Sequence, residues 1–320
     1  MKKTILLFSA LLTFGNLSAQ DKTALVNPII GTNGMGHTFP GACVPFGLVQ
    51  LSPDTDTIPH NVDGKYQPRA YEYCAGYQHK DSSIVGFSHT HFSGTGHSDL
   101  GDILIMPATG ELKLNPGTAT DPDGGYRSRF SHDTEVSRPG YYEVMLADYG
   151  VKAQLTATKR VGVHKYTFPK EAKNQRIILD MIHGIYNYDG KVLWTNIRVE
   201  NDTLVTGYRI TNGWARTNYT YFAMSFSKPV VHYGCEENLR AEASGYSFDR
   251  LAARAGETWN KELSVIEANG TDDQLAMLYT SLYHTMINPC VYTDVDGQYR
   301  GLDHNIHKAD DFTNYTVFSV

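Results

Sequence analysis

A segment rich in histidine, aspartate and glycine holds the residue types best suited to chemistry. Residues 84–107 read IVGFSHTHFSGTGHSDLGDILIMP, with a polar middle between two apolar, strand-like ends. Loops that bind ligands or catalyse reactions often carry such a density of titratable side chains, because a rigid scaffold positions them. The glycines allow positive φ angles or a close approach of the backbone to another surface. This pattern predicts a shaped loop at a binding site.

Three interpretations of the histidines remain open on sequence alone. The spacing His89-x-His91 would place two imidazoles on one face of a strand, with His97 and Asp99 close by. Zinc takes such nitrogen and oxygen ligands, although no third ligand is fixed by spacing. The alternatives are a hydrogen-bonding network around a polar ligand and bracing of the loop by its own side chains.

The carboxylates of the sequence raise the question of acid–base catalysis. Pairs of carboxylates hydrolyse glycosides, but an inverting enzyme needs them roughly 6.5–9.5 Å apart across the sugar. Asp99 and Asp102 stand three residues apart in one loop, so we expect them to bind nearby backbone N–H groups rather than to catalyse. Asp294, Asp296 and Asp303 lie around a DVDG turn, which lacks the closing glutamate of an EF-hand and favours a plain turn.

Short strand patterns dominate the elements that must position these residues. Turn residues separate the patterns, and no helical period intervenes between them. This succession predicts a mainly β chain built as an antiparallel β-sandwich. The predicted strands span 48–51, 141–147, 151–156, 161–168, 176–180, 191–199, 203–210 and 219–226.

Two helices are predicted beyond the strands. The first has an apolar face at the 3.6-residue period that runs from Phe248 to Trp259. The second spans 271–287, with Thr271 and Gln274 as a capping box and Pro289 beyond its end. The apolar face of the first helix consists of Phe248, Leu251, Ala252, Ala255 and Trp259.

Composition excludes several classes of protein. The 320 residues are 41% apolar with 29 glycines and 21 tyrosines, which favours a turn-rich β architecture with a real core. Lys2, Lys3 and the apolar run that follows predict a signal peptide over residues 1–19. Its removal leaves 26 basic against 34 acidic residues and no basic stripe, so we expect no nucleic-acid partner. We also expect no membrane insertion, because no second hydrophobic segment follows.

The cysteines and the end of the chain complete the sequence-based expectations. The four cysteines at 43, 74, 235 and 290 form no CxxC pair, so disulfides and free buried thiols both remain open. The chain ends in the apolar run YTVFSV, whereas a domain terminus is usually polar. We therefore expect the 320 residues to be the front part of a longer protein.

Three long motifs resemble glycoside hydrolase family 92, whose members are exported α-mannosidases. They are GTNGMGHTFPGACVPFGLVQLSPDT at 31–55, GFSHTHFSGTGHSDLGDILIMP at 86–107 and LYTSLYHTMINPCVYTDVDGQYRGLD at 278–303. The resemblance covers about residues 24–320. It implies a β-sandwich domain over 21–235, a linker with a helix over 236–268, and the start of an incomplete (α/α)6 catalytic domain over 269–320.

The resemblance also implies a function. Family enzymes are inverting, calcium-dependent exo-α-mannosidases, often specific for α-1,2 linkages, and their partner is a mannose-containing glycan. The catalytic carboxylates and most calcium ligands are expected beyond Val320, so no catalytic or metal-binding residue is assigned to this chain, and the chain alone is expected to be inactive. Export to the periplasm, the cell surface or the medium is expected. The rival hypotheses are a non-catalytic carbohydrate-binding module and a non-functional gene fragment.

The resemblance assigns only one part of the sugar pocket to this chain. The loop at 89–102 is expected to lie at the domain interface and to form part of the wall around the sugar. Its candidate substrate-binding residues are His89, His91, Ser93, His97, Asp99 and Asp102.

Overall fold

The computed structural model describes residues 21–94, 97, 99–188, 190–233, 248–301, 303 and 305–316. The predicted signal peptide, residues 236–247 of the predicted linker, Cys235 and the last four residues lie outside these ranges. The domain boundaries expected from the sequence stay predictions. Among the described cysteines, Cys43, Cys74 and Cys290 are free thiols.

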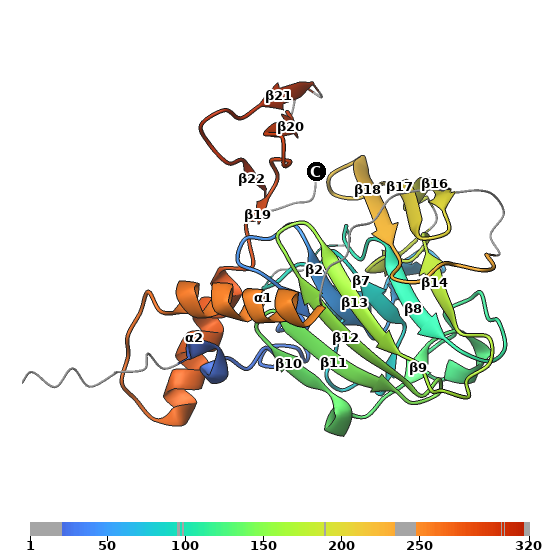
Figure 1. The fold of residues 1–320 in the computed structure, drawn as a ribbon, viewed down its shortest axis with the longest axis horizontal. Coiled ribbons are helices and arrows are strands. Elements are labelled where there is room, and N and C mark those ends of the chain that lie inside the picture. Colours follow the sequence, from blue (N-terminus) through green and yellow to red (C-terminus); the bar gives the residue numbers. More distant parts are fainter. Residues whose placement is uncertain are drawn as a thin grey trace, which may run out of the picture.

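Two antiparallel sheets pack face to face and form a β-sandwich (Figure 1). The side chains between them are apolar and include Leu51, Phe87, Tyr142 and Leu155, all fully buried. Because inward and outward side chains alternate along each strand, each sheet supplies one apolar face to this core. The five-stranded sheet has the order β1 (Ala42–Cys43), β2 (Gln50–Asp54), β7 (Gly86–Ser88), β8 (Leu104–Ala108) and β14 (Arg176–Asp180). The four-stranded sheet has the order β10 (Val136–Arg138), β11 (Tyr141–Leu146), β12 (Val151–Ala157) and β13 (Gly162–Thr167).

A third antiparallel sheet consists of β16 (Val192–Asn201), β17 (Leu204–Thr211) and β18 (Asn218–Ser225). It lies beside β8 and β14 at the upper right of Figure 1. One of its faces carries the exposed rings of Trp194, Tyr219 and Tyr221. The mainly β class and the sandwich are confirmed, and every predicted strand has a counterpart in the structure.

The remaining elements are short and connect or flank the sheets. A strand pair near the end of the chain, β19 (Cys290–Val291) with β22 (Tyr315–Thr316), leads into the arm at the top of Figure 1. The 3-10 helices are η1 (Lys22–Leu25), η2 (Pro68–Tyr73), η3 (Pro122–Gly124) and η4 (His132–Thr134). The short strands are β3 (Ile58–Pro59), β4 (Asn61–Val62), β5 (Lys65–Tyr66), β6 (Ser83–Ile84), β9 (Ser128–Arg129), β15 (Tyr186–Asn187), β19 (Cys290–Val291), β20 (Gln298–Arg300), β21 (Ile306–Lys308) and β22 (Tyr315–Thr316).

Two α-helices pack against each other and against the first segments of the sandwich. These are α1 (Phe248–Leu263) and α2 (Asp272–Thr285). Trp259 of α1 and Tyr283 of α2 are fully buried, and their rings pack at a tilt of 40° with centroids 4.4 Å apart. The Trp259 indole N–H donates to the Cys43 carbonyl at 2.8 Å, which fixes α1 to β1. The predicted capping box at Thr271 is present and begins α2. Within the described ranges, no helix is both long and apolar enough to cross a bilayer.

Candidate functional site

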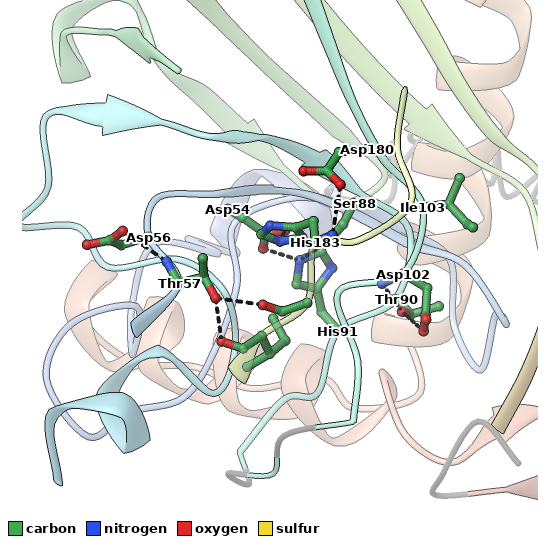
Figure 2. A network of polar contacts seen from close by, with 12 residues as sticks. Asp54, Asp56, Thr57, Ser88, Thr90, His91, Asp102, Ile103, Asp180 and His183 are labelled. Atoms are coloured by element: carbon green, nitrogen blue, oxygen red, sulfur yellow. Dashed lines mark hydrogen bonds and ion pairs between the residues drawn. The ribbon is translucent and has the colours of Figure 1, made fainter. Parts of the chain in front are cut away.

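A buried carboxylate, Asp54, is the centre of the polar network beneath the candidate loop. Asp54 ends β2, His91 follows β7, and His183 follows β14, so segments at the ends of three strands of one sheet bring the three side chains together (Figure 2). The Nε2 atoms of His91 and His183 lie 2.8 Å from the two carboxylate oxygens of Asp54. The Asp54 side chain is completely inaccessible to water. The network therefore fixes where the candidate loop leaves the sheet.

The partners of His91 define its protonation state. Its Nδ1 lies 2.7 Å from the carbonyl oxygen of Gln50, which can only accept a hydrogen bond. Its Nε2 faces the Asp54 carboxylate, so both ring nitrogens donate and the ring is an imidazolium. Burial alone raises the pKa of Asp54, but the charge of His91 and the hydrogen bonds from both histidines outweigh it and hold that pKa below its usual range.

Asp102 forms a second buried ion pair on the other side of the loop. Its carboxylate lies 3.1 Å from Nε of Arg209, and neither side chain is exposed. The Thr90 hydroxyl donates to the same carboxylate at 2.7 Å (Figure 2). Arg209 also donates to the carbonyl of His183 at 2.5 Å, which connects this pair to the segment that contacts Asp54. Nearby, burial and then the charge of Arg209 lower the pKa of Lys191 to about 7.

Asp99 connects the loop to the turn after β17. Its two oxygens accept the backbone N–H groups of Trp214 at 2.7 Å and Ala215 at 2.8 Å. The His97 ring packs on the Trp214 ring at a centroid distance of 4.9 Å. Trp214 is 66% exposed and the His97 side chain 31% exposed, so this ring pair presents an aromatic surface to solvent.

His89 belongs to a chain of neutral donors and acceptors between the sheets. Its Nδ1 donates to the carbonyl of Ile103 at 2.7 Å, and its Nε2 lies 3.1 Å from Nε2 of His164. The other nitrogen of His164 lies 2.6 Å from the Tyr166 hydroxyl. Burial lowers the pKa of His89 to about 4 and that of His164 well below its ordinary value. Both rings are therefore neutral near pH 7.

The loop also contacts the second helix. The Ser93 hydroxyl lies 3.5 Å from Nδ1 of His284 in α2, and Nε2 of His284 lies 3.1 Å from the Ile30 carbonyl oxygen. Since a carbonyl only accepts, Nε2 carries the hydrogen and Nδ1 accepts from Ser93. The candidate loop therefore bridges the sandwich, the third sheet and α2.

The comparisons with known proteins fit this arrangement. Residues 25–268 match the model of the glycosyl hydrolase family 92 N-terminal domain, and residues 234–320 match that of the family's catalytic domain. The chain belongs to glycoside hydrolase family 92.

Relatives within family 92 include solved structures. The family GH92 α-mannosidase BT3965 from Bacteroides thetaiotaomicron, solved alone and in complex with mannoimidazole, is 37% identical with a TM-score of 0.81. These matches cover 92% of this chain and 44% and 45% of the matched chains. The inverting mannosidase BT2199 from the same bacterium is 23% identical to this chain with a TM-score of 0.64. The match covers 93% of this chain and 44% of BT2199, and at this identity it supports the shared fold only.

A curated relative covers a shorter stretch. An uncharacterized secreted glycosidase from Arthroderma benhamiae is 30% identical over 178 residues, which is 51% of this chain and 20% of that protein. The chain thus spans less than half the length of the solved family 92 relatives and a fifth of the curated one.

The six loop residues predicted to wall a family 92 sugar pocket divide into two groups. His91, Asp99 and Asp102 are buried and engaged with other parts of the sandwich, and His89 is largely enclosed. Ser93 and His97 keep exposed surface. Binding of substrate by any of the six stays a prediction.

The sequence-based expectations for individual side chains had mixed outcomes. The prediction that Asp99 binds backbone N–H groups is confirmed, although they belong to a distant turn rather than to its own loop. The same prediction for the Asp102 carboxylate is wrong, because that carboxylate pairs with Arg209 and Thr90. The expected common face of His89 and His91 is also wrong, since β7 ends at Ser88 and the two rings have different partners.

Sequence reasoning missed four residues that the structure brings to the site: Asp54, His183, Arg209 and Trp214. Asp54 and His183 each lie at or just beyond the end of a strand. That position was the only sequence feature that could have pointed to them as site residues. Arg209 lies inside β17, and its burial beside Asp102 depends on contacts between distant strands.

Calcium, which the family resemblance implies, does not fit the carboxylates of this network. Calcium takes six to eight oxygen ligands, mostly from carboxylates, carbonyls and water. Here Asp54 is held by two histidines, Asp99 by backbone N–H groups, and Asp102 by Arg209 and Thr90. Recruiting any of them to calcium would break buried pairs, so this network is not a calcium site.

Proposed function

We propose that this chain forms one wall of the mannose site of a family 92 α-mannosidase. The proposal is supported by family membership and by the solved relative at TM-score 0.81, whose structure includes mannoimidazole. Ligand sites favour interfaces between domains, and the loop at 89–102 already contacts α2 through Ser93.

The observation that carries the proposal is that the three buried carboxylates around the loop already have hydrogen-bond or ion-pair partners within the chain. A general acid or base must reach a proton of the substrate, directly or through one water. Asp54, Asp99 and Asp102 are each nearly or fully buried and already paired, so they support the loop instead of reacting. We infer that the acid and the base are supplied by residues outside this chain. Because general acid–base catalysis is typically worth about 10²–10⁴-fold, the 320-residue chain alone is expected to be inactive or nearly so.

The exposed ring pair is the part of the wall best suited to contact sugar. Aromatic rings offer flat apolar faces, and a pyranose ring presents apolar C–H groups to such a surface. Trp214 and His97 supply this surface, and Asp99 fixes the backbone of the turn that carries Trp214. Trp214 and His97 are therefore proposed to pack against mannose, with Asp99 as a positioning residue.

The finer features belong to the same proposal. We propose an exported, calcium-dependent, inverting enzyme with a preference for α-1,2-linked mannose, whose calcium ligands lie mainly outside this chain. Each feature has its own assay on the protein with its complete catalytic domain: chelation and calcium repletion, the anomer released first, and the relative rates on mannobioses of different linkage. Sequencing of the DNA beyond Val320 tests whether that domain is encoded downstream.

The test of the wall uses binding and turnover together. The 320-residue chain is titrated with mannose and mannoimidazole and assayed on 4-nitrophenyl α-mannoside with and without calcium. Weak saturable binding without turnover is expected, and Trp214→Ala is expected to abolish it. Trp194→Ala is the matched control, because Trp194 is 61% exposed on β16 but has no described contact with the loop. Robust turnover by this chain would refute the assignment of the acid and base to other residues.

The rival function is a carbohydrate-binding module without catalysis. It is favoured by sugar binding that persists while the protein with its complete downstream domain shows no turnover. A gene remnant is favoured instead if no catalytic domain is encoded beyond Val320 and the chain binds no sugar.

A further inference from the structure

A second polar cluster lies away from the candidate sugar site, around the turn that contains η4. His79 lies on the segment after η2, and His132 and Glu135 lie in and directly after η4. One ligand atom from each of these residues lies within 4.8 Å of the other two. The two imidazole rings face each other with centroids 4.0 Å apart and an interplanar angle of 36°. Two nitrogens and one carboxylate oxygen thus converge from segments far apart in sequence.

The carboxylate of this cluster is fixed by partners behind it. The Glu135 side chain is 3% exposed and accepts hydrogen bonds from the Tyr77 hydroxyl at 2.9 Å and the Tyr142 hydroxyl at 2.6 Å. His79 is fixed by its backbone N–H, which donates to the Thr32 carbonyl at 2.9 Å. Metal-binding carboxylates are commonly oriented by such outer hydrogen bonds.

The open side of the cluster faces water. The His132 side chain is 37% exposed, and its Nδ1 lies 2.7 Å from Glu135. Ligands of one tetrahedral zinc ion stand about 3.4 Å apart, given zinc–ligand bonds of roughly 2.0–2.2 Å. Movement of the exposed His132 ring by less than about 1 Å would lengthen its 2.7 Å distance from Glu135 to this spacing.

We propose that His79, His132 and Glu135 form a zinc site, with water as the fourth ligand. Imidazole nitrogen suits zinc, whereas calcium and magnesium prefer oxygen ligands. The bound ion would connect the segment after η2 to η4 and so stabilise this end of the sandwich. The site is independent of the proposed sugar wall, since it shares none of its residues.

The experiment titrates chelator-treated protein with zinc chloride in a calorimeter, with calcium chloride and magnesium chloride as comparison ions. We expect one zinc per chain and much weaker binding of the other two ions. His132→Ala should weaken zinc binding by more than the roughly 10–100-fold typical of an outer-shell loss. Tyr142→Phe keeps the ligands but removes a donor to Glu135, so a loss of roughly 10-fold is expected.

Controls separate this site from other zinc-binding groups. His232→Ala removes an exposed histidine outside the cluster and should leave the zinc affinity unchanged. Cobalt in place of zinc should give the visible absorption of a tetrahedral site, which His132→Ala should remove. Absence of saturable zinc binding would overturn the proposal. The same affinity in His132→Ala and Glu135→Gln as in the unaltered protein would also overturn it, because the ion would then be bound elsewhere.

Discussion

Replacement of Asp54 by asparagine tests whether the buried carboxylate stabilises the fold through its charge. Asparagine has nearly the shape of aspartate, so Asp54→Asn creates no cavity. It offers one accepting oxygen in place of two, while His91 and His183 both donate to this carboxylate at 2.8 Å. One of the two hydrogen bonds is lost, and the His91 imidazolium loses its counter-ion.

The size of the effect follows from burial. Removal of one partner from a buried ion pair typically costs about 3–5 kcal/mol, because the other charge stays uncompensated. Water cannot replace the lost hydrogen bond at position 54, because the Asp54 side chain has no exposed surface. We expect Asp54→Asn to lower the free energy of unfolding by about 3–5 kcal/mol.

Urea unfolding followed by circular dichroism measures this change. Asp123→Asn is the matched control, because Asp123 pairs with Arg129 at the surface, where ion pairs contribute little. The pKa of Asp54 is lower in the folded state than in the unfolded one, so its stabilisation is present above about pH 4 and disappears as the pH falls further. The difference between the two proteins should shrink in that acidic range. A loss no larger than that of Asp123→Asn at neutral pH would refute the reasoning.

Three further predictions concern stability. Burial lowers the pKa of His89 to about 4, so between about pH 6.5 and pH 4 the unfolded state binds a proton that the folded state does not. The free energy of unfolding should therefore fall by about 3 kcal/mol as the pH is lowered through this range. Urea unfolding across this range should show a shallower decline for His89→Gln, and an equal decline would contradict the assignment. Thr271→Ala should cost about 1 kcal/mol by removing the N-cap of α2, measured by thermal unfolding, while Thr271→Ser should retain most of the cap. Gly76→Ala should destabilise the protein more than Gly64→Ala in the same measurement, because both glycines have positive φ but a Cβ at Gly76 would lie 1.9 Å from Asp54. Equal losses would show that only the backbone conformation matters.

The strands and helices of this fold were largely readable from local sequence patterns. The 176–180 strand was predicted with the bounds it has as β14, and β11, β12 and β13 differ from their predictions by a residue at one end or at both. Alternation of inward and outward side chains and turn residues at the strand ends carry this information locally. The capping box at Thr271 likewise predicted the start of α2.

The partners of polar side chains were much less readable. The sequence showed that residues 89–102 form a special loop, but it did not show that His91 pairs with Asp54 or that Asp102 pairs with Arg209. The residues of each pair are separated by many positions along the chain, and hydrogen bonds depend on distances of about 3 Å. No local periodicity records such contacts.

The sequence by itself therefore determined the β-sandwich class, the two helices and the resemblance of three motifs to family 92, since each depends on local order along the chain. Only the tertiary structure decided which histidines and aspartates are buried supports and which rings reach solvent. The physical reason is that charge and solvent access depend on neighbours in space. Asp54 is charged because two histidines meet it from other strands, and Trp214 lies beside His97 because Asp99 binds the turn that carries it.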